Sequence, residues 1–340
     1  MLKKIFYIAM ILVLVALAVG YVAKREVLFT GKTMGTTYHI KVIASGYQRT
    51  GMLPEKIETR LNEVNQSMSV FRKDSEISRF NNLKAVGEKF SVSKDFYRVM
   101  VLAATLYKWT DHAWDGTVMP LVNLWGFGNQ GVQHSIPDPE ALSEAKQWVG
   151  FNHILLGQDQ SLTKSMQNVT LDLGSIAKGF GVDAIAQLIR ENGFSNFIVE
   201  IGGEVFAAGV RKDGNPWRVG INRPDKDASP TQVYRSLPLQ EQALATSGDY
   251  RNFFEIDGIR YSHVMNPATG YPVTNGVVSA SVLADNCTIA DGLATAIMVM
   301  GHEKSLEIVN RLPGIECFIV VRQPDGSFID YASAGLKPME

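Results

Sequence analysis

The chain of 340 residues has few cysteines and no excess of either charge. Its two cysteines, Cys287 and Cys317, are too few for a disulfide framework. Each lies in an apolar run, so a single bridge between them and two buried free thiols are both open interpretations. The 33 basic and 34 acidic residues give a net charge of −1. That balance argues against a generic nucleic-acid-binding protein, because such proteins carry a basic excess or patch.

Internal repeats and low-complexity segments are also missing, and the composition is that of a globular protein. Hydrophobic residues make up 46% and charged residues 20% of the chain, which is long enough for one or two domains. Helical and strand patterns follow one another without regular βαβ alternation, so we expect an α+β fold. The periodicity predicts helices within 53–64, 96–107, 176–192 and 290–300, strands at 36–43, 196–201, 205–210, 216–222 and 277–283, and a last hairpin from 318 that turns at 324–326.

The N-terminus carries a long run without charge. Lys3 and Lys4 precede nineteen uncharged residues, Ile5–Ala23, which is about the length of a membrane-spanning helix. We expect residues 1–25 to be an uncleaved signal-anchor and residues 26–340 to form a body outside the cytoplasm; a signal peptide cleaved near Ala16-Leu17-Ala18 is the alternative. No nearby cysteine is present for lipid attachment. Residues 24–32 are interpreted as a short tether, and residues 126–140 as a surface loop.

The segment 290–300 offers oxygen ligands at helical spacing. Asp291 and Thr295 are four residues apart, so they share one face of the predicted helix. A carboxylate, a hydroxyl and a nearby carbonyl are hard ligands of the kind that Mg²⁺ takes in small number beside water and phosphate. The alternative is that Asp291 only caps the helix and Thr295 only packs.

Three further segments are weak signals when taken singly. In 171–179 a strand ends in a turn of small residues and a helix begins; its amides and Lys178 favour an anion, although the segment also fits an ordinary capped helix. His263 precedes a turn rich in Pro and Gly and is either a general base or a structural histidine. The glycines of 201–204 and 245–250 indicate either close backbone approach to a ligand or tight turns.

Taken together, seven blocks in order resemble the ApbE family of FAD:protein FMN transferases, over about nine-tenths of the chain. The blocks are GKTMGTTY at 31–38, TVMPLVNLWGFG at 117–128, LDLGSIAKGFGVD at 171–183, IGGE at 201–204, ATSGDYRNF at 245–253, SHVMNPATG at 262–270 and ADGLATAIMVMG at 290–301. The resemblance implies a single α+β domain of the ApbE type, related to the T-fold, behind the N-terminal apolar helix. Two departures from the family pattern are Phe71, where relatives often carry Tyr, and Asn266, where Asp is common.

The resemblance also implies the site. Matching positions give the metal ligands Ser175, Asp291, Ala294 (through its carbonyl) and Thr295. They give the flavin-nucleotide contacts Met34, Phe71, Ala113, Trp114, Asp115, Asp172, Lys178 and Met265. His263 is the expected base for the acceptor hydroxyl, with Asp291 as the second catalytic residue.

The function that follows from the resemblance is Mg²⁺-dependent transfer of FMN from FAD to a Thr or Ser hydroxyl of an acceptor protein, with release of AMP. Expected acceptors are flavin-carrying subunits of membrane redox complexes of the NADH:quinone oxidoreductase type. The expected location is the bacterial inner membrane, with the catalytic domain in the periplasm. Two alternatives remain: hydrolysis of FAD to FMN and AMP, and flavin binding without turnover.

Overall fold

The protein is described here from a computed structural model, which covers residues 24–128, 135–225, 232–249, 252–336 and 339. The predicted apolar helix at Ile5–Ala23 lies outside these residues. Within the described part of the chain, no helix is long and apolar enough to cross a bilayer.

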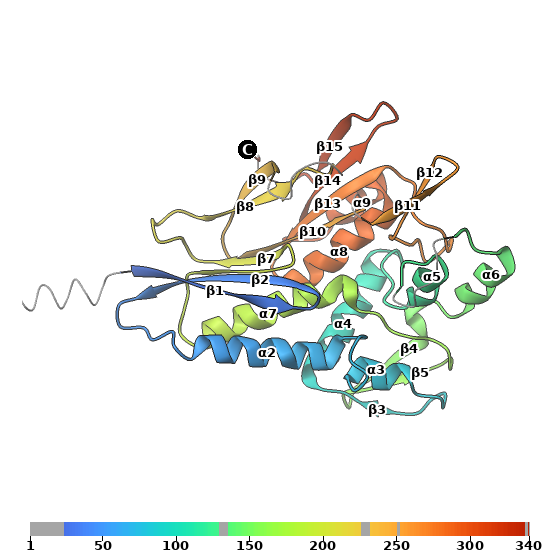
Figure 1. The fold of residues 1–340 in the computed structure, drawn as a ribbon, viewed down its shortest axis with the longest axis horizontal. Coiled ribbons are helices and arrows are strands. Elements are labelled where there is room, and N and C mark those ends of the chain that lie inside the picture. The colour runs from blue at the N-terminus through green and yellow to red at the C-terminus, as the bar shows by residue number, and fades with distance from the viewer. Residues whose placement is uncertain (1–23, 129–134, 226–231, 250–251, 337–338, 340) are drawn as a thin grey trace, which may run out of the picture.

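Eight antiparallel strands form the main sheet, in the order β1-β2-β6-β7-β10-β13-β14-β15. Helices α7 and α8 pack on one of its faces, and α2 and α4 pack on α7 and α8 in turn (Figure 1). The bounds are β1 Lys24–Thr33, β2 Thr36–Ser45, β6 Phe197–Ile201, β7 Glu204–Ala208, β10 Gln242–Gly248, β13 Val277–Ala284, β14 Glu316–Arg322, β15 Phe328–Ala332, α2 Leu53–Met68, α4 Lys94–Trp109, α7 Gly174–Glu191 and α8 Cys287–Met300.

Smaller elements surround this core. The β8–β9 hairpin is a separate two-stranded sheet, β3, β5 and β4 form a three-stranded one, and β11 pairs with β12. Their bounds are β8 Trp217–Asn222, β9 Val233–Leu239, β3 Phe90–Ser91, β4 Ile154–Gly157, β5 Ser161–Lys164, β11 Phe253–Ile256, β12 Ile259–Ser262, α3 Glu76–Asn81, α5 Met119–Leu124, α6 Pro139–Gln147, α9 His302–Val309 and the 3₁₀ turn Phe151–His153.

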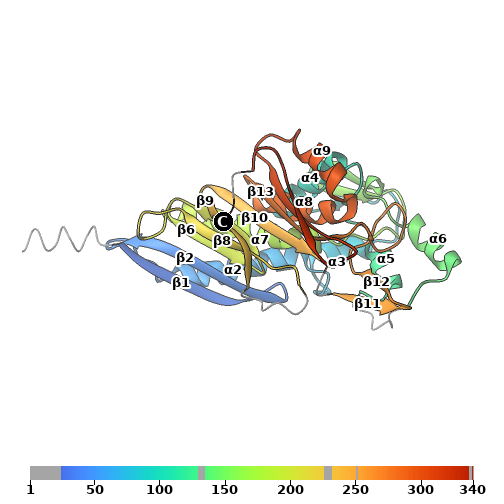
Figure 2. The same ribbon diagram turned by 90° about the horizontal axis from the view of Figure 1, so that it is seen from above.

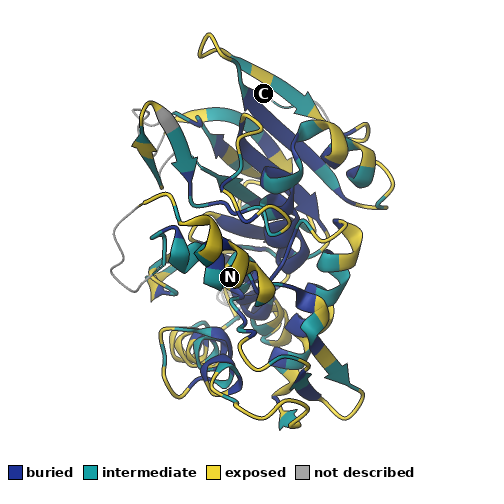
Figure 3. Cartoon of the chain, turned by 90° about the vertical axis from the view of Figure 1, so that its right-hand side faces the viewer, coloured by how far each residue is buried: buried dark blue, intermediate teal, exposed yellow. Residues whose placement is uncertain are grey.

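Apolar side chains alternate across the main sheet and form a core on each face. On β2, Ile40 and Val42 point to the helix side, whereas Ile43 points to the β8–β9 side, where Trp217 and Leu239 cover it. The central strands and the helices on them are accordingly the most buried part of the molecule (Figure 3). The result confirms the predicted α+β fold, with α7 and α8 side by side under the sheet.

The predicted tether at 24–32 is wrong, because Lys24 begins β1. This strand pairs with β2 along its whole length, from Lys24 opposite Ser45 to Thr33 opposite Thr36. Val27 and Phe29 are partly buried and alternate with the exposed Leu28. Because β1 is an edge strand with one neighbour, its apolar residues alternate only weakly. The sequence pattern of 24–32 therefore indicates an irregular segment and not a strand. Figure 2 shows the resulting long hairpin at one side of the molecule.

Two predicted boundaries also change. The helix expected to open at Ala290 begins at Cys287, where Asn286 caps it by accepting a hydrogen bond from the Ile289 amide at 2.9 Å. The predicted loop at 126–140 runs into α6, which starts at Pro139 behind the capping side chain of Asp138; residues 129–134 of that loop lie outside the described residues. The predicted helix 176–192 is confirmed, and Gly193 follows it with a φ of 85°.

Candidate active site

Two adjoining cavities of about 450 and 500 Å³ lie on either side of the N-terminal turn of α7. Asp172, Gly174 and Lys178 line both, so these residues form the ridge between them. The first cavity collects the predicted residues Ala113, Trp114, Asp115, Asp172, Ser175, Lys178, His263, Met265, Asp291 and Thr295. The second is more apolar and collects Met34 and Phe71 beside Val64, Met68, Val70 and Ala177. Of the predicted set, Ala294 lines neither wall, because its side chain is buried within α8.

Met34 reaches the second cavity from the tip of the β1–β2 hairpin. Met34 and Gly35 form a two-residue turn, and both have positive φ, at 49° and 73°. That geometry matches the twist of a two-residue hairpin but is unfavourable for a side chain such as that of methionine. Gly181 on α7 makes room for it, since a Cβ there would lie 2.8 Å from the Met34 methyl group.

Trp114 and Asp115 are buried in the loop that follows α4. The Trp114 indole Nε1 donates to the Ser175 hydroxyl at 3.0 Å. The Asp115 carboxylate accepts from the Thr117 amide at 2.8 Å, the Thr117 hydroxyl at 2.6 Å and the Phe151 amide at 3.1 Å. Burial raises the pKa of Asp115, and these hydrogen bonds oppose the rise. The carboxylate of Asp115 thus holds the loop in place, and Trp114 and Asp115 both line the first cavity.

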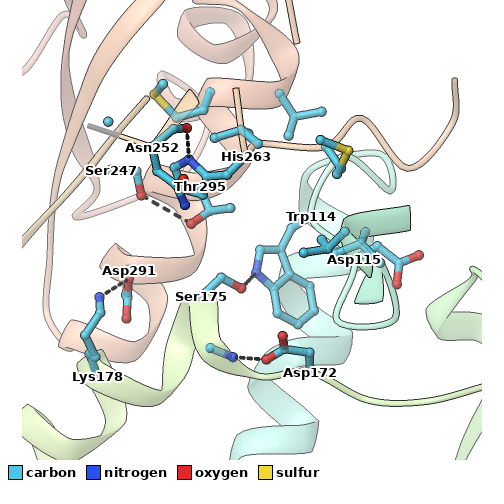
Figure 4. A pocket seen from close by; sticks show the side chains of 18 of the residues that line it. Trp114, Asp115, Asp172, Ser175, Lys178, Ser247, Asn252, His263, Asp291 and Thr295 are labelled. Carbon is cyan, nitrogen blue, oxygen red and sulfur yellow. Dashed lines mark hydrogen bonds and ion pairs between the residues drawn. The ribbon is translucent and has the colours of Figure 1, made fainter. Parts of the chain in front are cut away.

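Helices α7 and α8 bring the oxygen atoms of the predicted metal site together. Asp291 is 3% exposed, and its Oδ2 accepts from the Gly179 amide of α7 at 2.9 Å. One turn further along α8, the Thr295 hydroxyl lies 3.2 Å from that of Ser247 on β10. Ser175 faces them from the first turn of α7 (Figure 4). No group of three His, Cys, Asp or Glu side chains in the described ranges forms a metal cluster. A cation here would therefore depend on hydroxyl and carbonyl oxygens beside Asp291.

The helix-cap interpretation of Asp291 is wrong, because Asn286 occupies that position, five residues earlier. The start of α7 also differs from an ordinary capped helix: no side chain caps it from Leu173, and Asp172 Oδ1 accepts from the Gly174 amide at 2.8 Å. Burial raises the pKa of Asp172, and this hydrogen bond opposes the rise.

Lys178 lies between two buried carboxylates. Its Nζ is 2.7 Å from Glu204 Oε1 and 3.8 Å from Asp291 Oδ1. Burial by itself would lower the pKa of Lys178, but Asp291 and Glu204 outweigh it and raise the pKa. Burial, and then the charge of Asp291, raise the pKa of Glu204, and the ion pair with Lys178 opposes this rise. Lys178 is therefore a cation at neutral pH, and it forms part of the ridge between the two cavities.

His263 closes the first cavity on the side opposite α7. Its Nδ1 lies 3.2 Å from the Asn252 carbonyl oxygen, an acceptor, so Nδ1 carries the proton and Nε2 is the basic nitrogen. Burial lowers the pKa of His263 below its ordinary 6.5, although the hydrogen bond to Asn252 opposes this. The imidazole is therefore neutral at pH 7, as a general base requires.

Several residues of the site carried no role in the sequence prediction. Glu204 and Ser247 belong to the Gly-containing segments 201–204 and 245–250, for which the sequence indicates only close approach to a ligand or a tight turn. Asp183 of α7 accepts from the Cys287 amide at 2.7 Å and the Thr288 amide at 2.9 Å, and so joins the first turn of α8 to α7. Sequence spacing could not reveal that contact, because the partners are more than 100 positions apart.

The open question of the two cysteines is decided: Cys287 and Cys317 are both buried free thiols. Phe127 lines the first cavity, whereas the nearby Trp125 is fully buried in a small core with Leu121 and Leu142.

Comparison with known proteins places the chain in a family. The sequence profile of the ApbE family matches residues 34–319, so the chain belongs to the ApbE family. It is 43% identical over 317 residues to an FAD:protein FMN transferase of Vibrio cholerae, covering 92% of each chain. It is 38% identical over 337 residues to an FAD:protein FMN transferase of Haemophilus influenzae, covering 96% of each.

Solved structures agree with this placement. The flavin transferase ApbE from Vibrio cholerae superposes with a TM-score of 0.83 at 41% identity, over 92% of this chain and 98% of that one. The apo flavinyl transferase ApbE of Pseudomonas stutzeri also gives 0.83, at 35% identity, over 92% and 95%.

Proposed function

We propose that this protein transfers FMN from FAD to a Thr or Ser hydroxyl of an acceptor protein and releases AMP. The observation that carries the proposal is one cavity that combines a neutral histidine, a cationic lysine and a set of hard oxygens, and that adjoins a second, apolar cavity. FAD has two flat ring systems joined by a pyrophosphate. Two cavities with Lys178 on the ridge between them suit that shape, because the lysine then faces the charged linker. The activity named for the relatives supports the same assignment.

In the proposed reaction, the acceptor oxygen bonds to the FMN phosphorus, and the bond from that phosphorus to the oxygen of the AMP phosphate breaks. His263 Nε2 takes the proton of the acceptor hydroxyl. Lys178 stabilises the negative charge that moves to the departing AMP phosphate. The apolar wall with Met34 and Phe71 holds a ring system in place. Positioning and charge neutralisation are the main sources of rate acceleration in phosphoryl transfer.

The donor set fits magnesium. Asp291 Oδ1 is 3.8 Å from the Lys178 Nζ, and the hydroxyls of Ser175 and Thr295 line the same cavity. These are hard oxygens, few enough to leave coordination positions for water and phosphate. Ser175, Asp291, Thr295 and the carbonyl of Ala294 would hold the ion. When bound, it neutralises charge on the phosphate oxygens of the pyrophosphate.

The test is mass spectrometry of an acceptor peptide after incubation with FAD and Mg²⁺. A gain of the FMN mass on the hydroxyl residue, with AMP in equal amount, is the expected result. FMN and AMP without labelled peptide would mean that the protein is a hydrolase, and intact FAD after prolonged incubation would mean that it only binds flavin. A peptide with the hydroxyl residue replaced by alanine is the matched control.

The location is proposed on the N-terminal sequence. The apolar run Ile5–Ala23 would anchor the chain in the inner membrane, with the body in the periplasm and flavin-carrying subunits of redox complexes as its acceptors. Strand β1 starts at Lys24, directly after this run, and ends beside Met34 in the second cavity. At its rise per residue, the ten residues of β1 span roughly 30 Å, which is the greatest distance that this strand could put between the membrane and the second cavity. Membrane fractions that release the protein in alkaline carbonate would argue against the anchor, and protection from added protease in spheroplasts would argue against the periplasmic side.

A further inference from the structure

Glu204 is a buried carboxylate in the wall of the first cavity, and one of its two oxygens has no hydrogen-bond partner among the described residues. It opens β7 after the turn at Gly202 and Gly203, and it is 3% exposed. Its Oε1 pairs with Lys178, whereas its Oε2 is buried and has no hydrogen-bond partner in the described part of the chain. An unpaired buried carboxylate oxygen is costly, so its retention indicates a role in the site.

Lys178 is closer to Glu204 than to Asp291, at 2.7 Å against 3.8 Å. Gly202 allows this approach: its φ is 62°, and a Cβ there would lie 3.3 Å from the lysine Cδ. The ammonium group therefore hydrogen-bonds to Glu204 and keeps its remaining protons for the cavity. Asp291 Oδ1 stays beyond hydrogen-bond distance from it.

We infer that Glu204 is a positioning residue that holds Lys178 away from Asp291. Opposite charges attract strongly in a buried site, so without Glu204 the ammonium group would move onto Asp291. It would then occupy the oxygen that a divalent cation needs and turn away from the pyrophosphate. Glu204 thus keeps the cation site and the phosphate-binding lysine separate. The inference rests on the proposed function for its catalytic consequence, but its geometric part concerns cation binding alone.

The first experiment measures Mn²⁺ binding without FAD, by the electron paramagnetic resonance signal of free Mn²⁺. Glu204→Asp keeps the charge but is one methylene too short to hold Lys178. We expect it to weaken Mn²⁺ binding about tenfold, within the range of coupled neighbouring residues. In a Lys178→Met background the same change should alter binding by less than about twofold, because no lysine remains to be held. If Glu204→Asp weakens Mn²⁺ binding equally in both backgrounds, Glu204 contacts the ion itself. If it weakens Mn²⁺ binding in neither background, Glu204 has no role in cation binding. Either outcome overturns the inference.

The second experiment is a double-mutant cycle on FMN transfer with Glu204→Gln and Lys178→Met. We expect Glu204→Gln to lower kcat about tenfold with KM for FAD nearly unchanged, and the double variant to be no slower than Lys178→Met. If the losses in kcat of the two single variants multiply in the double variant, Glu204 does not act through Lys178 and the inference is refuted. Glu241→Gln is the matched control, since Glu241 pairs with Arg190 outside both cavities. Unfolding midpoints of all variants separate misfolding from mispositioning. If the wild-type protein transfers no FMN, the proposed function fails while the Mn²⁺ cycle still tests Glu204.

Discussion

Gly179 sets the distance between the two helices that carry the site, so Gly179→Ala is the sharpest test of the geometry. A Cβ at this position would lie 2.3 Å from the Cys287 carbonyl oxygen and 2.9 Å from the Asp291 Cβ. Ordinary contact begins at 3.4 Å, so α7 and α8 would have to separate by about 1 Å. The Gly179 amide also donates to Asp291 Oδ2 at 2.9 Å, and this bond would lengthen.

The expected change in the free energy of unfolding of Gly179→Ala is the difference between two opposing effects. Overpacking costs about 1–3 kcal/mol, while alanine gains about 1 kcal/mol of helix propensity over glycine. The free energy of unfolding should therefore fall by about 0–2 kcal/mol, a modest loss. The kcat for FMN transfer should fall about 100-fold, because a shift of about 1 Å moves Asp291 away from Lys178 and Ser175.

The assay compares urea unfolding with kcat for FMN transfer in Gly179→Ala and Gly181→Ala. Gly181 is the matched control on the same helix, because its new Cβ would meet side chains and no backbone: the Met34 methyl group at 2.8 Å and the Ile201 Cδ1 at 3.3 Å. We expect Gly181→Ala to keep its kcat, while its KM for FAD should rise because Met34 is displaced in the second cavity. Wild-type kcat in Gly179→Ala would refute the argument that the spacing of α7 and α8 sets the site.

Four further predictions concern Asp291, His263, the pH dependence and Asp183. Asp291→Ala should abolish FMN transfer and lose Mn²⁺ binding; full activity with Mg²⁺ would refute the metal assignment. His263→Ala should lower kcat about 10²–10⁴-fold with little change in FAD affinity by fluorescence titration, and an equal loss of both would indicate a binding role. Because burial lowers the pKa of His263, wild-type kcat/KM should hold through pH 7 and fall only below pH 6.5, and this acid limb should vanish in His263→Ala. Asp183→Ala should lower the free energy of unfolding by about 2 kcal/mol in urea, since two amides at the start of α8 lose their acceptor; unchanged stability would count against that role.

Much of the fold followed from periodicity, and the exceptions have physical causes. Central strands such as β6 and β13 and the long helix α7 have strong apolar patterns, so they were predicted close to their bounds. The edge strand β1 was not, since pairing on one side leaves a weak pattern. The apolar run predicts the start of α8 three residues late, at Ala290, because the start is set by the Asn286 cap and not by that run.

Local patterns in the sequence are sufficient to predict most helices and the central strands, the family resemblance and the residue types of the site. The ordered blocks carry Asp291, Lys178 and His263, because each block keeps its local spacing in the chain. Which of these residues meet depends on how the helices and strands pack. Gly179 lets α8 approach α7 until Asp291 lies beside Lys178, and Glu204 arrives from β7 to hold that lysine. Such distances depend on helix packing between residues far apart in sequence, and no local pattern encodes them.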